Sequence, residues 1–205
     1  VFAVCMLFWP KTLAVLAAIA MAIYWTGAIH EDGWGDMVDG FGGGWEKQRI
    51  LDIMKDSRVG SYGVIAIVLA LLGKFALLNE MDAELIPLAL ISGHALSRFC
   101  STLLLATMDY VRDDLLSKAK PLATRLSTAE FMVAALFAVA GLCFLPLEKI
   151  VPGIAIAALA TLWLARLFRS WLGGYTGDCL GAVQQVSEIG FYLGLLAVFP
   201  PFFGQ

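Results

Sequence analysis

Long apolar stretches alternate with polar segments along this chain of 205 residues. Residues 12–29 carry no charged side chain, and a bilayer core of about 30 Å needs roughly 20 such residues in a helix. The same pattern predicts further helices near residues 62–79, 85–108, 129–147, 150–168 and 186–203. Together with the apolar residues 1–10, these stretches predict an all-α polytopic bundle of about six to seven membrane spans.

Two long polar segments, residues 30–61 and 109–128, interrupt the apolar pattern. Within the first, residues 45–56 predict a short amphipathic helix at the membrane surface. Its apolar face carries Ile50, Leu51 and Met54, and its polar face carries Gln48, Asp52 and Asp56. We therefore expect one integral membrane domain over residues 1–205, with residues 30–61 as its acidic active-site segment. Because the chain opens within an apolar run, further N-terminal residues are expected. Shorter connectors are predicted at 80–84, 148–149 and 169–185.

The composition supports a membrane protein. Hydrophobic residues make up 60% of the chain and charged residues 15%, with a mean hydropathy of +0.81. Soluble domains are roughly 45–50% apolar and about 25% charged. The lipid bilayer is therefore an expected partner, and no nucleic-acid partner is expected.

The basic residues predict the orientation of the chain. Lys11 and Lys149 lie on one set of connectors, and Lys74 and Arg98 fall within spans. The other lysines and arginines lie in the two long polar segments and at the end of the fifth predicted span: Lys47, Arg49, Lys55, Arg58, Arg112, Lys118, Lys120, Arg125, Arg166 and Arg169. Because loops rich in Lys and Arg stay in the cytoplasm, the acidic segment is expected on the cytoplasmic face. Lys74 is expected to snorkel toward a helix end without a catalytic role.

An acidic stripe follows the span predicted at residues 12–29. Asp32, Asp36 and Asp39 are spaced i, i+4 and i+7, so that on a helix they share one face. Like charges on one stripe repel one another, and a divalent cation held by oxygen ligands, such as Mg²⁺, Ca²⁺ or Mn²⁺, would compensate them. Asp52 and Asp56 on a second helix would complete a two-metal arrangement for phosphoryl transfer. The alternative interpretation is a solvated loop with ordinary surface acids.

Four motifs resemble those of the cobalamin synthase family, also called adenosylcobinamide-GDP ribazoletransferase. They are H-x-D-G-x-x-D-x-x-D-G at His30–Gly40, R-x-x-x-I-M-K-D-S-R-x-G at Arg49–Gly60, H-A-L-S-R at His94–Arg98 and G-x-T-G-D-x-L-G-A at Gly174–Ala182. The resemblance implies an enzyme of a prokaryotic inner membrane. That enzyme joins α-ribazole, or its 5′-phosphate, to adenosylcobinamide-GDP and releases GMP in the last steps of cobalamin biosynthesis.

The resemblance also implies a cofactor and its ligands. The active-site layout is similar to that of the CDP-alcohol phosphotransferases, which use D-x-x-D-G and D-x-x-x-D around metal ions. The similar halves here are Asp36–Gly40 and Asp52–Asp56. The expected cofactor is Mg²⁺ (or Mn²⁺), and its expected ligands are Asp36, Asp39, Asp56, Asp32, Asp52 and Glu31. The expected catalytic acids are Asp32, Asp36, Asp39 and Asp56, and one of them, such as Asp32, could instead act as the base for the ribose hydroxyl.

The expected substrate-binding residues are Lys55, Arg58, Lys118, Lys120, Asp178, Arg98 and His94. Lys118 and Lys120 are explained equally well by the positive charge of cytoplasmic loops. His94 and Arg98 are one helical turn apart, and they either contact substrate or pair with Glu188.

Rival functions stay open at this point. A CDP-alcohol phosphotransferase acting on lipid would share the acidic halves, but this chain has a shorter linker between them and lacks the A-R-x8-G element of that class. An ion-coupled transporter would place charges near the bilayer midplane, whereas these acids cluster at one face. Because membrane enzymes of the similar phosphotransferase class are dimers, a homodimer is also considered.

Overall fold

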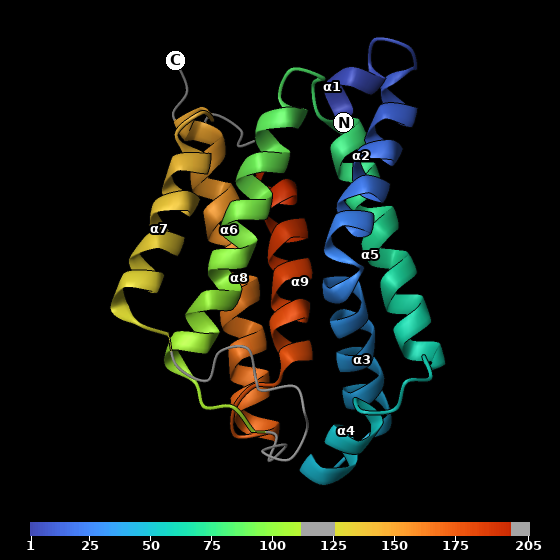
Figure 1. Ribbon diagram of the computed structural model, residues 1–205, viewed down its shortest axis with the longest axis vertical. Helices are drawn as coiled ribbons and strands as arrows, with labels where there is room; N and C mark the ends of the chain where they lie inside the picture. The colour runs from blue at the N-terminus through green and yellow to red at the C-terminus, as the bar shows by residue number, and fades with distance from the viewer. Residues whose placement is uncertain (112–125, 198–205) are drawn as a thin grey trace, which may run out of the picture.

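The computed structural model describes residues 1–111 and 126–197, and these residues are mostly helical (Figure 1). The long helices lie side by side along the long axis of the molecule, which confirms the predicted all-α bundle. The helices are α1 (Phe2–Cys5), α2 (Lys11–Thr26), α3 (Ile29–Gly43), α4 (Lys47–Ile53), α5 (Ser61–Glu80), α6 (Ile86–Thr107), α7 (Thr128–Leu142), α8 (Leu147–Trp171) and α9 (Gly177–Leu195).

α9 is the central helix of the bundle. It packs against α8, α3, α6 and α5, and most of its residues are buried. Its polar residues Gln184, Gln185 and Glu188 are each no more than 2% exposed. Because the surrounding helices shield α9 from lipid, it can carry polar groups that would be costly on a lipid-facing helix.

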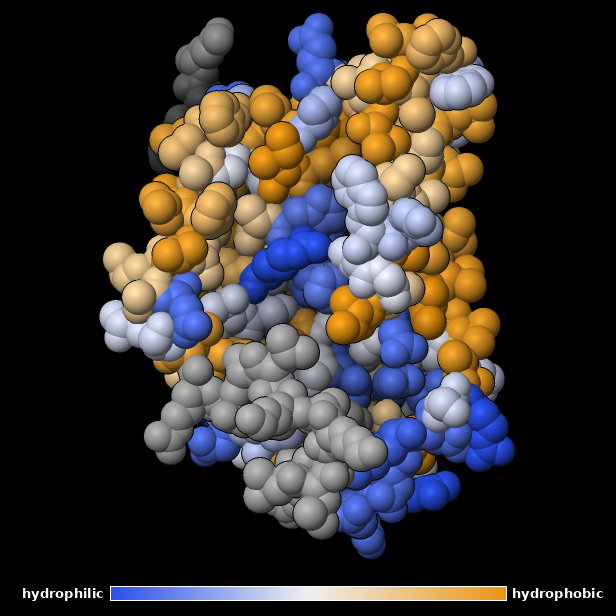
Figure 2. Space-filling model, in the orientation of Figure 1, coloured by the Kyte–Doolittle hydropathy of each residue, from blue (hydrophilic) through white to orange (hydrophobic). Residues whose placement is uncertain are grey.

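Three of the described helices, α5, α6 and α8, are long and apolar enough to cross a membrane. α2 and α3 meet the same criteria only as a pair, bent by 85° at their junction, and α7 is a shorter apolar helix. Hydrophobic side chains cover much of the face shown in Figure 2. The membrane character expected from the sequence is confirmed, and the larger expected number of spans stays a prediction.

The junction between α2 and α3 turns the chain sharply. Gly27 and Ala28 both adopt left-handed backbone conformations, with φ of 64° and 58°. Glycine adopts this conformation freely, whereas an L-residue with a Cβ is strained by roughly 1–2 kcal/mol. The Ala28 amide donates to the Ile23 carbonyl at 3.0 Å, which ends α2 as in a Schellman motif. The two left-handed residues thus produce the bend from which α3 starts.

The start predicted for the last span lies too far along the chain. α9 starts at Gly177 rather than near residue 186, so the connector before it shortens to residues 172–176. Thr176 is the N-cap of α9, and its hydroxyl accepts a hydrogen bond from the Cys179 amide at 3.3 Å. The prediction was wrong because it followed apolarity, whereas the first half of α9 is polar and shielded by other helices. Residues 198–203 of that predicted span lie outside the described residues.

The described parts of the basic polar segments lie at one end of the bundle, which is the lower end in Figure 1. The Lys47 Nζ lies 3.8 Å from the position that a Cβ on Gly173 would take, so α4 lies beside the loop after α8. Tyr175 in that loop forms backbone hydrogen bonds with Asp109 and Val111, of 2.9 and 3.0 Å. The described parts of the three polar segments therefore meet, as the charge pattern predicts.

The two lysines predicted on the remaining connectors lie in the first turns of α2 and α8, and they bind the ends of other helices. Lys11 donates to the carbonyl of Met81 after α5, and Lys149 donates to the carbonyl of Leu195 at the end of α9, both at 3.1 Å. A cation near the C-terminal carbonyls of a helix is favourable because those groups carry a partial negative charge. These two lysines therefore have a structural role at the end of the bundle opposite α4.

Candidate active site

The acidic stripe lies on one continuous helix, α3, as the spacing predicts. Asp32 is exposed, Asp36 is half-buried and Asp39 is 8% exposed. Burial increases along the stripe toward the end of α3 that meets the start of α5. The three acids are equivalent in the sequence pattern, but they have different surroundings in the fold.

Asp39 caps the N-terminus of α5. Its Oδ2 accepts from the Gly60 amide at 2.6 Å, and its Oδ1 accepts from the Gly63 amide at 2.8 Å. A Cβ on either glycine would collide with this carboxylate. A negative charge is favourable there because the first amides of a helix lack partners within the helix. Both oxygen atoms of Asp39 are therefore engaged in joining α3 to α5.

Replacing Asp39 by alanine is expected to lower the free energy of unfolding by about 2–3 kcal/mol, because two hydrogen bonds to an ionised acceptor are lost together. Thermal unfolding of the detergent-solubilised protein measures this change. Asp32→Ala is the matched control, since Asp32 is exposed on the same helix and surface substitutions change stability by about 0.5 kcal/mol or less. Equal destabilisation by the two variants would contradict the capping role.

The start of α9 packs directly on α3. A Cβ on Gly33 would lie 3.0 Å from the Cα and the carbonyl oxygen of Asp178, and a Cβ on Gly181 would lie 3.2 Å from the carbonyl oxygen of His30. Small residues at these positions let the two backbones approach closely. Asp36 follows Gly33 by one helical turn. Acids from α3 and α9 therefore border the same region of the bundle.

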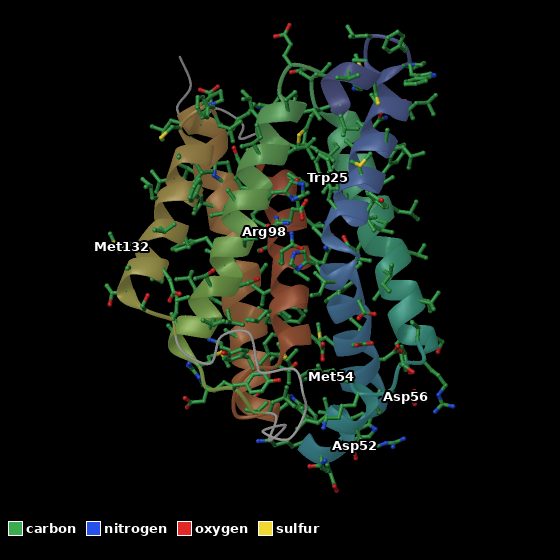
Figure 3. All side chains as sticks on the ribbon, viewed as in Figure 1. Trp25, Asp52, Met54, Asp56, Arg98 and Met132 are labelled. Atoms are coloured by element: carbon green, nitrogen blue, oxygen red, sulfur yellow. The ribbon has the colours of Figure 1, made fainter. Side chains whose placement is uncertain are left out.

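A second acidic pair lies at the end of the bundle. On α4, the predicted short helix, Gln48 donates to Asp52 at 3.0 Å. Asp56 lies beyond the end of α4, so the prediction that it continues the helix face of Asp52 is wrong. Its two carboxylate oxygens accept from the guanidinium of Arg58, with a shortest distance of 2.6 Å. Figure 3 shows Asp52 and Asp56 at the lower end of the molecule and Arg98 at mid-height.

The Arg58 guanidinium lowers the pKa of the Asp56 carboxyl to about 2. Because this folded-state pKa lies below the unfolded value, the pair stabilises the fold above about pH 4 and loses that effect as the pH falls toward 2. Arg58→Gln is expected to return the pKa toward its ordinary value of 3.8. An NMR titration of carboxyl-labelled aspartate measures the shift, and an unchanged pKa in the variant would contradict the pairing.

A buried polar cluster lies inside the bundle, where α5, α6 and α9 meet. Lys74 and Glu188 form an ion pair of 3.0 Å and are only 5% and 2% exposed. Gln184 and Tyr192 also donate to Glu188, at 2.7 and 2.8 Å. The His94 Nδ1 lies 3.6 Å from the same carboxylate. The expectation that Lys74 snorkels toward a helix end is therefore wrong, because its charge is compensated within the bundle.

A pocket joins this cluster to the first turn of α3. Its polar walls include His30 and Glu31 from α3, His94 and Arg98 from α6, and Gln185 from α9. Gln185 donates to Glu31 at 2.9 Å, and Arg98, which is exposed, donates to the His94 carbonyl at 3.0 Å. Figure 2 shows hydrophilic side chains at mid-height of this face, with hydrophobic surface above and on both sides. The pocket therefore places polar groups from three helices at the depth of the apolar part of the bundle.

The expected Mg²⁺ ligands do not form one cluster. Among residues 1–111 and 126–197, no group of three His, Cys, Asp or Glu side chains is placed to hold a metal ion. Glu31 accepts from Gln185 and Asp39 caps α5, while Asp52 and Asp56 lie beyond α3 on α4 and its connection to α5. Lys118 and Lys120, two of the expected substrate-binding residues, lie outside the described part of the chain.

Known proteins resemble this chain over nearly its whole length. The sequence profile described as cobalamin-5-phosphate synthase matches residues 1–196. The chain belongs to this family. A Polaromonas protein named adenosylcobinamide-GDP ribazoletransferase is 44% identical over 92% of this chain and 73% of its own length. Relatives with the same name from Shewanella halifaxensis and Vibrio cholerae are 43% and 44% identical, over 93% and 90% of this chain and 75% and 71% of their own lengths. No solved structure matches the chain.

Membership of the cobalamin-5-phosphate synthase family confirms the resemblance drawn from the motifs, and the fold shows what each motif builds. The first motif lies in α3, and the second contains most of α4 and the Gly60 amide that binds Asp39. The third motif lies in α6, and the fourth contains the N-cap and the start of α9. Sequence reasoning missed Gln184 and Gln185 because it placed them in a polar connector. A usable signal was the i, i+4 spacing of Gln184 and Glu188, which puts both on one helix face.

Proposed function

We propose that this protein joins α-ribazole, or its 5′-phosphate, to adenosylcobinamide-GDP with release of GMP. Its family supports this function, because the relatives from Polaromonas and Vibrio cholerae carry the name of that transferase. In the fold, the supporting observation is the close packing of the start of α9 on α3 at Gly33. This packing brings Asp178 beside the helix that carries Asp32 and Asp36.

The chemistry requires a base and a polar site for a pyrophosphate. The ribose hydroxyl oxygen forms a new bond to the phosphorus on the cobinamide side, the bond from that phosphorus to GMP breaks, and the hydroxyl proton passes to a base. Asp32 and Asp36 share one face of α3, and their carboxylates can accept this proton. Asp39 is set apart from them because both its oxygens accept from amides of α5.

Dependence on Mg²⁺ (or Mn²⁺) is part of this proposal. Magnesium is usually held by one or two carboxylates together with substrate phosphates, so the proposed ligands are the carboxylates of Asp32 and Asp36 and the pyrophosphate of the substrate. When bound, a divalent ion neutralises charge on the pyrophosphate. Full turnover after exhaustive treatment with EDTA would contradict this dependence.

We also propose that the site faces the cytoplasm from the inner membrane of a prokaryote. The support is the gathering of α4, the loop after α8 and residues 109–111 at one end of the bundle, since these segments carry or adjoin most of the lysines and arginines. A homodimer stays a prediction, and light scattering of the detergent-solubilised protein would check it.

Turnover by the purified protein in lipid nanodiscs tests the function. With adenosylcobinamide-GDP and α-ribazole 5′-phosphate, we expect GMP and a cobamide in equal amounts. A CDP-alcohol substrate is expected to yield no CMP, and release of CMP instead of GMP would favour the lipid phosphotransferase. Uptake of substrate into sealed proteoliposomes without any GMP release would favour the transporter.

A further inference from the structure

The pocket beside the buried polar cluster contains acceptor atoms without donors. Gln185 is 1% exposed, and in the described part of the chain its Oε1 has no hydrogen-bond partner. The Oε2 of Glu31 is buried and is likewise without a partner among the described residues. Both residues line the same pocket. Because unpaired buried acceptors are rare and costly, we expect a ligand that presents hydrogen-bond donors to them.

The same pocket offers donors on another wall. The Arg98 guanidinium has five N–H groups, and one of them binds the His94 carbonyl at 3.0 Å. Arg98 lines this pocket, and Figure 3 places it at mid-height of the bundle, away from Asp52 and Asp56 at the lower end. A matching ligand therefore carries donors on one edge and acceptors on another.

Size and hydrogen-bonding pattern choose among the fragments of the proposed substrates. The pocket has a cavity volume of about 20 Å³, and all the space between its walls, counted together with the solvent it opens to, is about 380 Å³. A corrin macrocycle exceeds this space. The benzimidazole of α-ribazole has no ring N–H once it is joined to ribose, so it offers no donor. Guanine is flat and small, and its N1–H and 2-amino group form a donor edge, while its O6 and N7 form an acceptor edge.

We propose that this pocket binds the guanine base of the nucleotide, with its donor edge on Glu31 Oε2 and Gln185 Oε1 and its acceptor edge on Arg98. Arginine is a common partner of guanine O6 and N7. Glu31 precedes Asp36 by about 7.5 Å along α3, which suits a ribose between the base and a phosphate beside Asp36. The inference rests on the proposed function for the presence of a guanosine nucleotide.

Equilibrium binding of GMP and IMP to the full chain in lipid nanodiscs tests this pocket. The two nucleotides differ only by the 2-amino group, so their phosphates contribute equally. GMP is expected to bind about tenfold more tightly than IMP, as for one added hydrogen bond to a buried acceptor. AMP, which lacks the N1–H as well, is expected to bind more weakly than GMP. Equal affinities for GMP and IMP would overturn the proposal.

Variants test whether Gln185 is responsible for the preference for GMP over IMP. Gln185→Leu removes the unpaired acceptor and is expected to bind GMP and IMP alike. The control is Ser92→Ala, which removes a buried hydroxyl that donates to Gly141 at 2.6 Å and does not line the pocket. This control is expected to keep the tenfold ratio, and loss of the ratio there as well would overturn the assignment to Gln185. If Gln185→Leu does not fold, the ratio measured for the unsubstituted chain decides alone.

Failure of the pocket and failure of the function are distinguishable. Turnover of adenosylcobinamide-GDP together with equal binding of GMP and IMP would contradict the guanine pocket and support the transferase function. Tighter binding of GMP than of IMP without any turnover would support the guanine pocket and contradict the transferase function.

Discussion

Asp36→Asn is expected to lower turnover by about 10²–10³-fold, the usual effect of removing one electrostatic group from a reaction site. Asp36 lies in the middle of the acidic stripe, is half-buried, and follows the Gly33 contact with Asp178 by one turn. Asparagine has nearly the same shape but carries no charge and cannot accept the hydroxyl proton. The loss is therefore expected whether the carboxylate acts as a base or as a ligand of a divalent ion.

The release of GMP measures the effect, and thermal unfolding shows whether the variant is folded. Asp82→Asn is the matched control, because Asp82 is an exposed acid in the connection from α5 to α6, at the opposite end of the bundle from α4. We expect this control to retain the unsubstituted rate. Activity of Asp36→Asn within a few-fold of the control would contradict a role of Asp36 in the reaction.

Lys74→Met is expected to lower the free energy of unfolding by about 3–5 kcal/mol, because it leaves the carboxylate of Glu188 buried without its cation. Glu188 is 2% exposed and lies in the central helix, where water cannot compensate its charge. The hydrogen bonds from Gln184 and Tyr192 remain, but neither group is charged.

Thermal and denaturant unfolding in the same detergent measure this loss. The double variant Lys74→Met with Glu188→Gln is expected to recover part of the stability, since it removes both charges and keeps an acceptor for Tyr192. Lys47→Met, at an exposed lysine of α4, is the control and is expected to change stability by about 0.5 kcal/mol or less. A neutral Lys74→Met variant would mean that the ion pair is not needed for folding.

These variants separate the two polar regions of the molecule. The region around Asp36 and Asp178 is expected to control the rate, whereas the pair of Lys74 and Glu188 is expected to control stability. Asp39 is expected to control stability, although it shares the acidic stripe with Asp36, because both its oxygens bind amides at the start of α5. A survey of activity alone would confuse these effects.

Much of the fold follows from local sequence properties. The apolar stretches near residues 62–79 and 85–108 correspond closely to α5 and α6, because a lipid-facing helix must be apolar along most of its length. α9 was placed too late, because a helix enclosed by other helices can be polar. Apolarity therefore identifies helices that contact lipid, and it fails for the central helix α9, which carries more buried polar residues than any other described helix.

The sequence by itself determined the helical membrane character, the acidic face of α3 and the motifs of the family, because apolar length and residue spacing are local properties. Only the tertiary structure decided which of the polar groups meet. Asp39 binds an amide 24 residues away, Lys74 pairs with a carboxylate 114 residues away, and Glu31 accepts from an amide 154 residues away. Such partners depend on how helices pack, and no spacing within a single helix encodes them.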